Sequence, residues 1–342
     1  MNSAERFLTA LRGQVPDRVP IFELYIHPDI IEALIPGATL PEFVESMELD
    51  AISSLWMTDG TIAETWIDDR TTVDEWGVTW RYGAENRGPI AGPIQTLDDV
   101  RHYTPPDPDA PHRLANLREY IARFKGKKAV IYQQRFGFMW AADLRRFDNF
   151  LIDCLENPQL VHELLEIAND FAIKLARNAV RAGADAVVFG DDLAFKTGPL
   201  MSPMAFKEFM LPRLSRAVEA VKAEGALCIM HSDGNLWKLL DMIVDTGVDG
   251  VNPLEPVAGM DIGEVKRKYG DRVCLLGNID CGELLSQGSV EEVERTVKET
   301  IRVAAPGGGY IMSSSNAIHS AVKPENYRAM IEAAKRYGKY PL

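Results

Sequence analysis

The chain has 342 residues, of which 46% are hydrophobic and 25% are charged, so it can bury a large core. Its formal net charge of −13 argues against nucleic acid or an anionic membrane as the main partner. No stretch resembles a signal peptide or a membrane span of about 20 apolar residues, and four unevenly spaced cysteines form no disulfide framework. These features favour a cytoplasmic protein.

Eight short apolar runs follow one another along the chain. From the third run onward, each one precedes a longer stretch with apolar residues at three-to-four spacing, which is typical of a buried parallel strand and its crossover helix. The predicted strands begin at Val19, Asp50, Lys128, Ala184, Ala226, Val248, Val273 and Gly308. We therefore expect an α/β fold in which residues 1–342 form one (β/α)8 TIM barrel domain.

One region between about residues 71 and 113 departs from this alternation. Residues 71–83 alternate and turn like a β-hairpin, whereas residues 102–113 are too rich in Pro and Asp for a regular element. We expect this region to be an inserted hairpin and loop excursion from the barrel. Elsewhere, Ser202 before Pro203 predicts a helix start, and Ser289 with Glu292 resembles a capping box.

The predicted strands end in polar residues, and in a barrel of this class the chemistry lies at the carboxyl ends of the strands. These residues are Glu23, Tyr25, His27, Thr58, Asp59, Gln133, Gln134, Arg135, Asp191, Asp192, His231, Asp233, Asn235, Asn252, Glu255, Asn278, Asp280, Cys281, Ser313, Ser315, Asn316 and His319. We expect substrate-binding residues among them, namely Glu23, Tyr25, Gln134 and Asn252.

Asp191 and Asp192 form a pair of acids at one strand end. Two consecutive residues of a regular strand point to opposite sides, so we expect one carboxylate to face the cavity and the other to accept backbone donors from residues 195–198. The inward carboxylate could bind a substrate hydroxyl or act as a general acid, and we expect His231 and Asp233 to join the pair as catalytic residues. The alternative is a structural cap for the loop before Ser202.

Aromatic residues follow the third predicted strand. Phe138 and Trp140 lie near the expected mouth, and Trp56 is available from the second strand. Such rings can stack on an aryl substrate or cover a flat cofactor, so Phe138 and Trp140 are also candidates for substrate binding. Ordinary core packing is the alternative interpretation.

Five segments carry a family resemblance. They are RFLTALRGQVPDRVPI, FGDDLAFKTGPLMSPMAFKEFMLPRL, HSDGNLWKLLDMIVDTGVDGVNPLEP, GNIDCGELL and SSSNAIHSAVKPENYRAMIEAA. Together they resemble the uroporphyrinogen decarboxylase superfamily over nearly the whole chain. The resemblance implies a (β/α)8 barrel and one of two activities, which are decarboxylation of porphyrinogens and zinc-dependent methyl transfer that serves corrinoid proteins.

The start of the chain separates these two branches. The decarboxylase branch carries an Arg-Gln-Ala-Gly-Arg segment, whose arginines meet the acidic side chains of the tetrapyrrole. This chain has PIFELYIHPDI at the matching place and no arginine between Arg18 and Arg70. A substrate with many carboxylates would lack its anchors, so the resemblance is to the methyltransferase branch, including O-demethylase components.

The resemblance also bears on a metal site. Thiol methyltransferases of the family use a His-x-Cys motif and a later Cys, but this chain keeps only His231, with Asp233 and Asn316 at the two Cys positions. Related methionine synthases take a Glu from the next strand, which implies His231, Glu255 and Cys281 as zinc ligands with a fourth position open. Asp233 could be a further ligand or orient the imidazole. The alternatives are a structural His, a loop-capping Glu and a buried Cys.

Residues after the last predicted strand are candidates for contact with the cofactor. Ser315, Asn316 and His319 precede a helix with Pro324 near its first turn, and they offer donors to an anionic group such as a corrinoid phosphate. Equally, the serines could satisfy backbone groups at the helix entry.

These observations predict an enzyme that transfers a methyl group from a methylated small molecule, such as an aryl methyl ether, to the cob(I)amide of a separate corrinoid protein. We expect zinc to assist, in an anaerobic O-demethylation system. The alternatives are a related decarboxylase with another substrate and a non-catalytic binding barrel. The expected partners are the corrinoid protein and the small molecule, with a homodimer allowed and with neither nucleic acid nor membrane.

Overall fold

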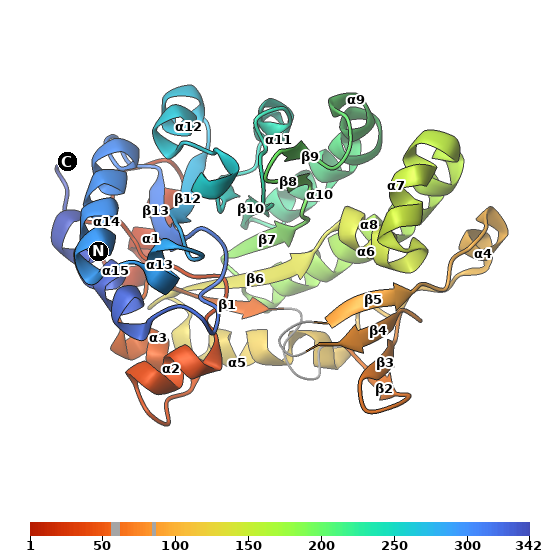
Figure 1. Ribbon diagram of the computed structural model, residues 1–342, viewed down its shortest axis with the longest axis horizontal. Coiled ribbons are helices and arrows are strands. Elements are labelled where there is room, and N and C mark those ends of the chain that lie inside the picture. The colour runs from red at the N-terminus through yellow and green to blue at the C-terminus, as the bar shows by residue number, and fades with distance from the viewer. Residues whose placement is uncertain (56–61, 84–86) are drawn as a thin grey trace.

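A computed structural model describes residues 1–55, 62–83 and 87–342 of the protein (Figure 1). Three residues that the sequence placed near the barrel mouth, Trp56, Thr58 and Asp59, lie outside the described residues.

Seven parallel strands form a curled sheet in the order β1-β6-β7-β10-β11-β12-β13. The strands are β1 (Ala51–Leu55), β6 (Ala129–Arg135), β7 (Ala186–Gly190), β10 (Leu227–His231), β11 (Gly250–Asn252), β12 (Cys274–Ile279) and β13 (Tyr310–Ser314). Each one lies within a run that the sequence predicts. The α/β assignment and the parallel order are therefore confirmed.

The first predicted strand is an irregular segment, residues 19–26, that lies between β13 and β1. On one side the N–H of Phe22 donates to the carbonyl of Met312 at 3.0 Å, and on the other side the N–H of Asp50 donates to the carbonyl of Ile21 at 2.9 Å. The segment thus closes the barrel with few hydrogen bonds. Its prediction as a regular strand is wrong, whereas the barrel itself is confirmed.

Asp50 fastens this segment to β1. Its fully buried carboxylate accepts the N–H of Ile21 at 2.8 Å and pairs with Arg6 at 2.7 Å and with Arg18 at 2.9 Å. A buried carboxylate needs such partners, because its desolvation is otherwise costly. The segment is therefore held firmly at its start, and beyond Phe22 its backbone bonds to residues after β13.

The excursion from the barrel is larger than predicted. It forms a four-stranded antiparallel sheet of β2 (Glu64–Trp66), β3 (Thr71–Asp74), β4 (Thr79–Tyr82) and β5 (Arg87–Ala91), at one side of the molecule (Figure 1). The predicted hairpin corresponds to β3 and β4 alone. Its turn is fixed by Asp74, whose carboxylate accepts the N–H groups of Trp76 and Val78 and the indole N–H of Trp80. Of residues 102–113, for which the sequence predicts no regular element, residues 103–110 lack regular structure, whereas His102 ends α4 (Leu97–His102) and residues 111–113 belong to the 3₁₀ helix η1 (Pro111–Leu114), where the prediction is wrong.

Helices surround the sheet, and a short hairpin, β8 (Ala194–Phe195) with β9 (Gly198–Pro199), follows β7. The helices are α1 (Ser3–Leu11), α2 (Pro28–Leu34), α3 (Leu40–Ser46), α4 (Leu97–His102), η1 (Pro111–Leu114), α5 (Ala115–Phe124), α6 (Gly137–Arg145), α7 (Phe147–Glu156), α8 (Pro158–Ala182), α9 (Pro203–Ala205), η2 (Phe206–Met210), α10 (Leu211–Ala223), α11 (Leu240–Asp245), η3 (Pro256–Ala258), α12 (Ile262–Tyr269), α13 (Leu284–Gln287), α14 (Val290–Ala304) and α15 (Pro324–Tyr337). The predicted caps at Ser202 and Ser289 are both present. Among the described helices, none is long and apolar enough to cross a membrane.

Candidate functional site

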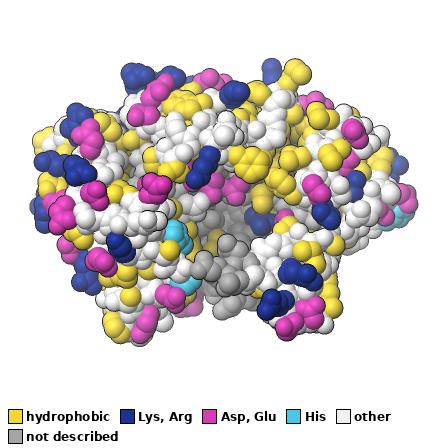
Figure 2. Space-filling view, viewed as in Figure 1, with side chains coloured by type: hydrophobic (Ala, Val, Ile, Leu, Met, Phe, Trp, Pro, Cys, Tyr) yellow, Lys and Arg dark blue, Asp and Glu magenta, His cyan; other side chains and the backbone are white. Residues whose placement is uncertain are grey.

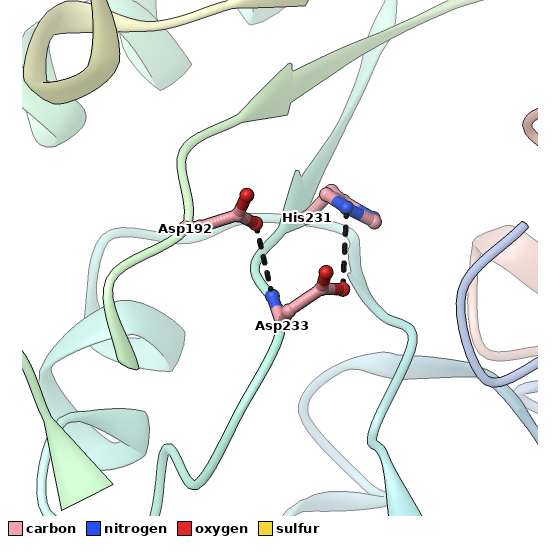
Figure 3. Close-up of side chains that lie close together, drawn as sticks. All are labelled: Asp192, His231 and Asp233. Atoms are coloured by element: carbon pink, nitrogen blue, oxygen red, sulfur yellow. Dashed lines mark hydrogen bonds and ion pairs between the residues drawn. The ribbon is translucent and has the colours of Figure 1, made fainter. Parts of the chain in front are cut away.

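Three side chains at the carboxyl ends of β7 and β10 form the candidate site (Figure 3). Ligand atoms of Asp192, His231 and Asp233 all lie within 4.8 Å of one another. His231 Nε2 is 3.6 Å from Asp233 Oδ1, and the backbone N–H of Asp233 donates to Asp192 Oδ1 at 3.3 Å. The two strands are paired neighbours, with Gly190 opposite His231, so the residues that follow them meet at one edge.

Asn252, at the end of β11, sets the orientation of His231. The amide oxygen of Asn252 lies 2.5 Å from His231 Nδ1. Since that oxygen can only accept, Nδ1 carries the proton and a neutral ring keeps its lone pair on Nε2. Nε2 is also the atom near Asp233, so the ring presents a free basic nitrogen to the carboxylates.

One carboxylate oxygen of Asp233 accepts a hydrogen bond from a side chain, and the other accepts none from the described residues. The amide of Asn316 donates to Asp233 Oδ2 at 2.5 Å, whereas the buried Oδ1 has no hydrogen-bond partner among the described residues. Burial raises the pKa of Asp233 to about 7; Asp192 and Glu255 act in the same direction, against the opposing effects of His231 and Asn316. The unsatisfied oxygen marks a place where a proton or a cation would find a partner.

This cluster fits the zinc ion that the resemblance implies. One imidazole nitrogen and two carboxylates are ligand types that zinc accepts, and three protein ligands leave a fourth position open. A metal would also satisfy Asp233 Oδ1, and the Asn252 contact supplies the outer hydrogen bond that orients a ligating imidazole. Among the described acidic residues, Asp192 and Asp233 are the ones whose carboxylates the structure groups with His231.

The other predicted metal ligands have different neighbours in the structure. Glu255 accepts the N–H of Gly234 at 2.6 Å, and Cys281 contacts Ser315, whose hydroxyl lies 3.5 Å from its sulfur. Among the described residues, neither joins His231 in a cluster of ligand atoms. Burial raises the pKa of the Cys281 thiol, which disfavours the thiolate that zinc prefers. Their role as ligands stays a prediction.

Asp191 turns away from the cluster and anchors helix α6. Its fully buried carboxylate accepts the backbone N–H groups of Phe136, Phe138 and Met139 at 3.3, 2.8 and 3.0 Å. Burial raises the pKa of Asp191 to about 7, although these donors oppose that shift. The expectation that one acid of the pair takes backbone donors is met, but the donors come from the N-cap and first turn of α6 and not from residues 195–198. The carboxylate that faces the cluster is that of Asp192.

Three residues that we expected to bind substrate are instead part of the core. Gln134 is fully buried and donates to the carbonyl of Ala172 at 2.7 Å. Phe138 is also fully buried and packs edge-on against Phe147, and Trp140 packs against Trp76. Successive side chains of a strand point to opposite sides, so Gln134 of β6 points away from the barrel axis. Phe138 and Trp140, in the first turns of α6, also pack outside the barrel mouth. We therefore leave all three out of the proposed substrate site.

The remaining predicted residues occupy varied positions. Asn316 reaches the cluster through Asp233, whereas His319 Nδ1 accepts the N–H of Ala321 at 3.3 Å, and the buried Ser315 contacts Cys281. Glu23 and Tyr25 line a separate cavity, which is described below.

An open cavity of about 370 Å³ lies beside the cluster. Its lining residues are Met139, Phe147, Asp192, Ala194, Phe195, Lys196, Leu200, Asp233, Gly234 and Glu255. The space-filling view shows the molecule hollowed near its centre, with acidic side chains on the wall of the hollow (Figure 2). The wall combines apolar side chains, three acids and one lysine, so it suits a partly apolar ligand with a polar end.

Sequence reasoning missed Phe195 and Lys196. They belong to the short hairpin of β8 and β9, and Phe195 is 62% exposed although it lines the cavity. A two-residue strand leaves no periodic signal in the sequence, and an isolated Phe-Lys pair in a loop is common. The turn residues of the Lys-Thr-Gly stretch were the only signal that pointed to a hairpin there.

Comparisons with known proteins agree over almost the full length of the chain. The family described as "Uroporphyrinogen decarboxylase (URO-D)" matches residues 2–337. The methylcobamide:CoM methyltransferase MtaA of Methanosarcina barkeri is 27% identical, with 97% of each chain covered. The uroporphyrinogen decarboxylase of Alkalilimnicola ehrlichii is 25% identical, with 96% of this chain and 93% of that protein covered. A solved methyltransferase from Methanosarcina mazei shares the fold, with a TM-score of 0.77, 19% identity, and coverage of 98% of this chain and 99% of that chain.

Proposed function

Because this chain belongs to the uroporphyrinogen decarboxylase family, we propose that it is a methyltransferase that moves a methyl group from a methylated small molecule to the cob(I)amide of a separate corrinoid protein. The observation that carries the proposal is the cluster of Asp192, His231 and Asp233, with Nε2 of His231 free for a ligand. The similarity to the methyltransferase MtaA supports it. The absence of arginine between Arg18 and Arg70 argues against a substrate with many carboxylates.

In this proposal Asp192, His231 and Asp233 hold zinc. When bound, zinc supplies Lewis acidity toward the oxygen of the methyl donor and so stabilises that oxygen as it departs. Asn252 keeps the imidazole proton on Nδ1, and Asn316 holds one carboxylate oxygen of Asp233 in place. Glu255 fixes the loop that carries Asp233 through its bond to Gly234.

We propose that the methyl donor lies in the cavity beside the cluster. Apolar side chains of Met139, Phe147 and Phe195 can contact an aryl ring, and Lys196 can pair with a carboxylate on that ring. Asn316 and His319, after β13, are candidates for contact with the corrinoid of the partner protein. The proposed donor is therefore an aryl methyl ether, with its ether oxygen directed toward the cluster and its methyl group left open to the corrinoid, which takes the methyl from the side opposite the oxygen.

The test is to mix the protein with zinc, a reduced corrinoid protein and a panel of methoxylated aromatic compounds. Formation of methylcobalamin, followed in the visible spectrum, is the expected result for at least one donor. His231→Ala should abolish it, whereas His102→Ala, on the exposed surface of α4, should leave the rate unchanged. Equal rates for both variants would contradict the assignment of the site.

A decarboxylase that acts on another substrate is the second candidate, because a decarboxylase from the family is similar at 25% identity. The raised pKa of Asp233, about 7, would suit proton transfer to a carbanion. Metal content separates the two candidates. Full activity in protein stripped of metal by a chelator would favour the decarboxylase, and recovery only after zinc is restored would favour methyl transfer.

A further inference from the structure

A second cavity, of about 580 Å³, lies where the irregular first segment parts from β1. Asp50 joins the first segment to β1 at one end of the cavity. Beyond this contact the backbone of the segment bonds to the other side, where the N–H of Ile318 donates to the carbonyl of Tyr25. The cavity shares no lining residue with the one beside His231 among the described residues. It is therefore a separate feature of the fold, and it arises from the weak pairing of the first segment.

The described lining of this cavity has a distinct chemical character. It contains three acids and two tyrosines, but no lysine or arginine among the described residues. The acids are Glu23, Asp29 and Glu32, and the tyrosines are Tyr25 and Tyr120. An anionic ligand would meet only repulsion from such a wall, whereas a cation would be attracted by the acids and by the faces of the rings.

Glu23 is the buried acid of the cavity. It is 5% exposed, and Ser313 and Ser314 orient it through their hydroxyl groups, which lie 3.2 and 2.7 Å from Oε2. Oε1 accepts only the N–H of Ser314, at 3.0 Å, among the described residues, so it can accept a further donor. Burial raises the pKa of Glu23 to about 8, although the hydrogen bonds from Ser314 and Ser313 oppose this shift.

Most of the rest of the lining is apolar, and its other polar residues are Thr39, Ser53 and Asn116. Side chains of Ile31, Leu40, Val44, Leu49 and Ile52 form the walls, and the volume is within the range of small-molecule sites. The cavity thus combines an apolar body with one buried hydrogen-bond acceptor and an acidic entrance.

We propose that this cavity binds a small organic cation with an apolar body, such as an aryl-alkyl ammonium, whose N–H donates to Glu23. The acidic side chains Asp29 and Glu32 draw the cation to the entrance, and Tyr25 and Tyr120 contact it along the way. The site is independent of the proposed methyl transfer and of the cluster at His231.

The test is calorimetric titration of the full chain with three probes of similar shape. At a pH above about 8, where Glu23 is ionised, we expect 2-phenylethylammonium to bind at least about tenfold more tightly than 2-phenylethanol, and 3-phenylpropanoate not to bind, since one ion pair in a buried site contributes about 1.4 kcal/mol or more. Absence of binding by the ammonium probe, or equal binding by the alcohol or the carboxylate, would overturn the proposal.

Two variants locate the site. Glu23→Gln should weaken binding of the ammonium probe about tenfold and leave binding of the alcohol unchanged. Leu40→Trp, at a half-buried position of the wall, should block binding of both probes if the folded state is retained. Thermal unfolding verifies that each variant folds. His231→Ala should bind the ammonium probe as the wild type does, which separates failure of this proposal from failure of the proposed methyl transfer. If both variants fold and bind the probe as the wild type does, the site is not in this cavity.

Discussion

Replacement of Asn252 by Ala should weaken zinc binding without unfolding the barrel. The amide oxygen lies 2.5 Å from His231 Nδ1 and fixes the ring so that Nε2 faces Asp233. Without this acceptor, the ring can rotate or move its proton to Nε2, and both changes remove the lone pair that binds metal. Loss of such an outer hydrogen bond costs about 10-fold to 100-fold in metal affinity, which equals about 1.4 to 2.8 kcal/mol.

The assay is competition for zinc between the protein and a chromophoric chelator, with the rate of corrinoid methylation as a second readout. Asn252→Asp retains an acceptor for Nδ1 and should keep most of the affinity. This variant should cost stability, because its second carboxylate oxygen takes the buried place of an Nδ2 atom that has no hydrogen-bond partner among the described residues.

The matched control is Asn278→Ala. Asn278 is another buried amide at a neighbouring strand end, but it donates to the carbonyl groups of Leu254 and Met260 rather than to His231. This variant should lose a similar amount of stability and retain zinc. If Asn252→Ala binds zinc within about twofold of the wild type, or if Asn278→Ala loses as much affinity, the reasoning on the imidazole orientation is refuted.

Three further predictions concern other residues of the site and the core. Asp191→Ala should lower the free energy of unfolding by about 3 kcal/mol, measured by urea denaturation, because it leaves the N–H groups of Phe138 and Met139 unpaired, and Asp191→Asn should lose less. The pKa of Glu23 is about 8 in the folded protein and 4.5 as its ordinary value, so the folded state keeps a proton that the unfolded chain releases. The free energy of unfolding should therefore fall as pH rises from about 4.5 to about 8. Glu23→Gln should make this fall smaller when urea midpoints are measured across that pH range. An unchanged pH dependence would contradict the raised pKa of Glu23. Replacing Asp233 and Asn316 together by Cys should raise zinc affinity at least about tenfold in the chelator assay, and a fall in affinity would argue against a metal at this position.

The sequence predicts the barrel well where each strand is a continuous apolar run. Strands β6 to β13 of the barrel are short and rich in Val, Ile and Leu because both faces are buried, and such a run has few alternative structures. The first segment has the same length but contains Pro20, which lacks an N–H, and the polar Glu23. Its position between two strands depends on Asp50, and no local pattern reveals that contact.

The sequence predicts which strand-end residues lie at the site but not how each side chain is oriented. Polar residues at strand ends place His231, Asp192 and Asp233 at one edge, because parallel strands share that edge. The orientation of each side chain depends on backbone groups far away in sequence. Asp191 accepts N–H groups at the start of α6, and Glu255 accepts the N–H of Gly234, and neither contact follows from local spacing.

The contact between Asp233 and Asn316 links the sequence resemblance to the chemistry that we propose. By the resemblance, these two residues stand where the thiol methyltransferases of the family carry cysteines, and in this structure Asn316 Nδ2 lies 2.5 Å from Asp233 Oδ2. A carboxylate and a neutral amide are harder ligands than two thiolates and donate less charge, so a metal held by His231 and carboxylates would be a stronger Lewis acid. Strong Lewis acidity suits a poor leaving group such as an ether oxygen, whereas a thiol needs activation as a nucleophile. The replacement of both thiolates therefore supports an oxygen-linked methyl donor and argues against a thiol acceptor.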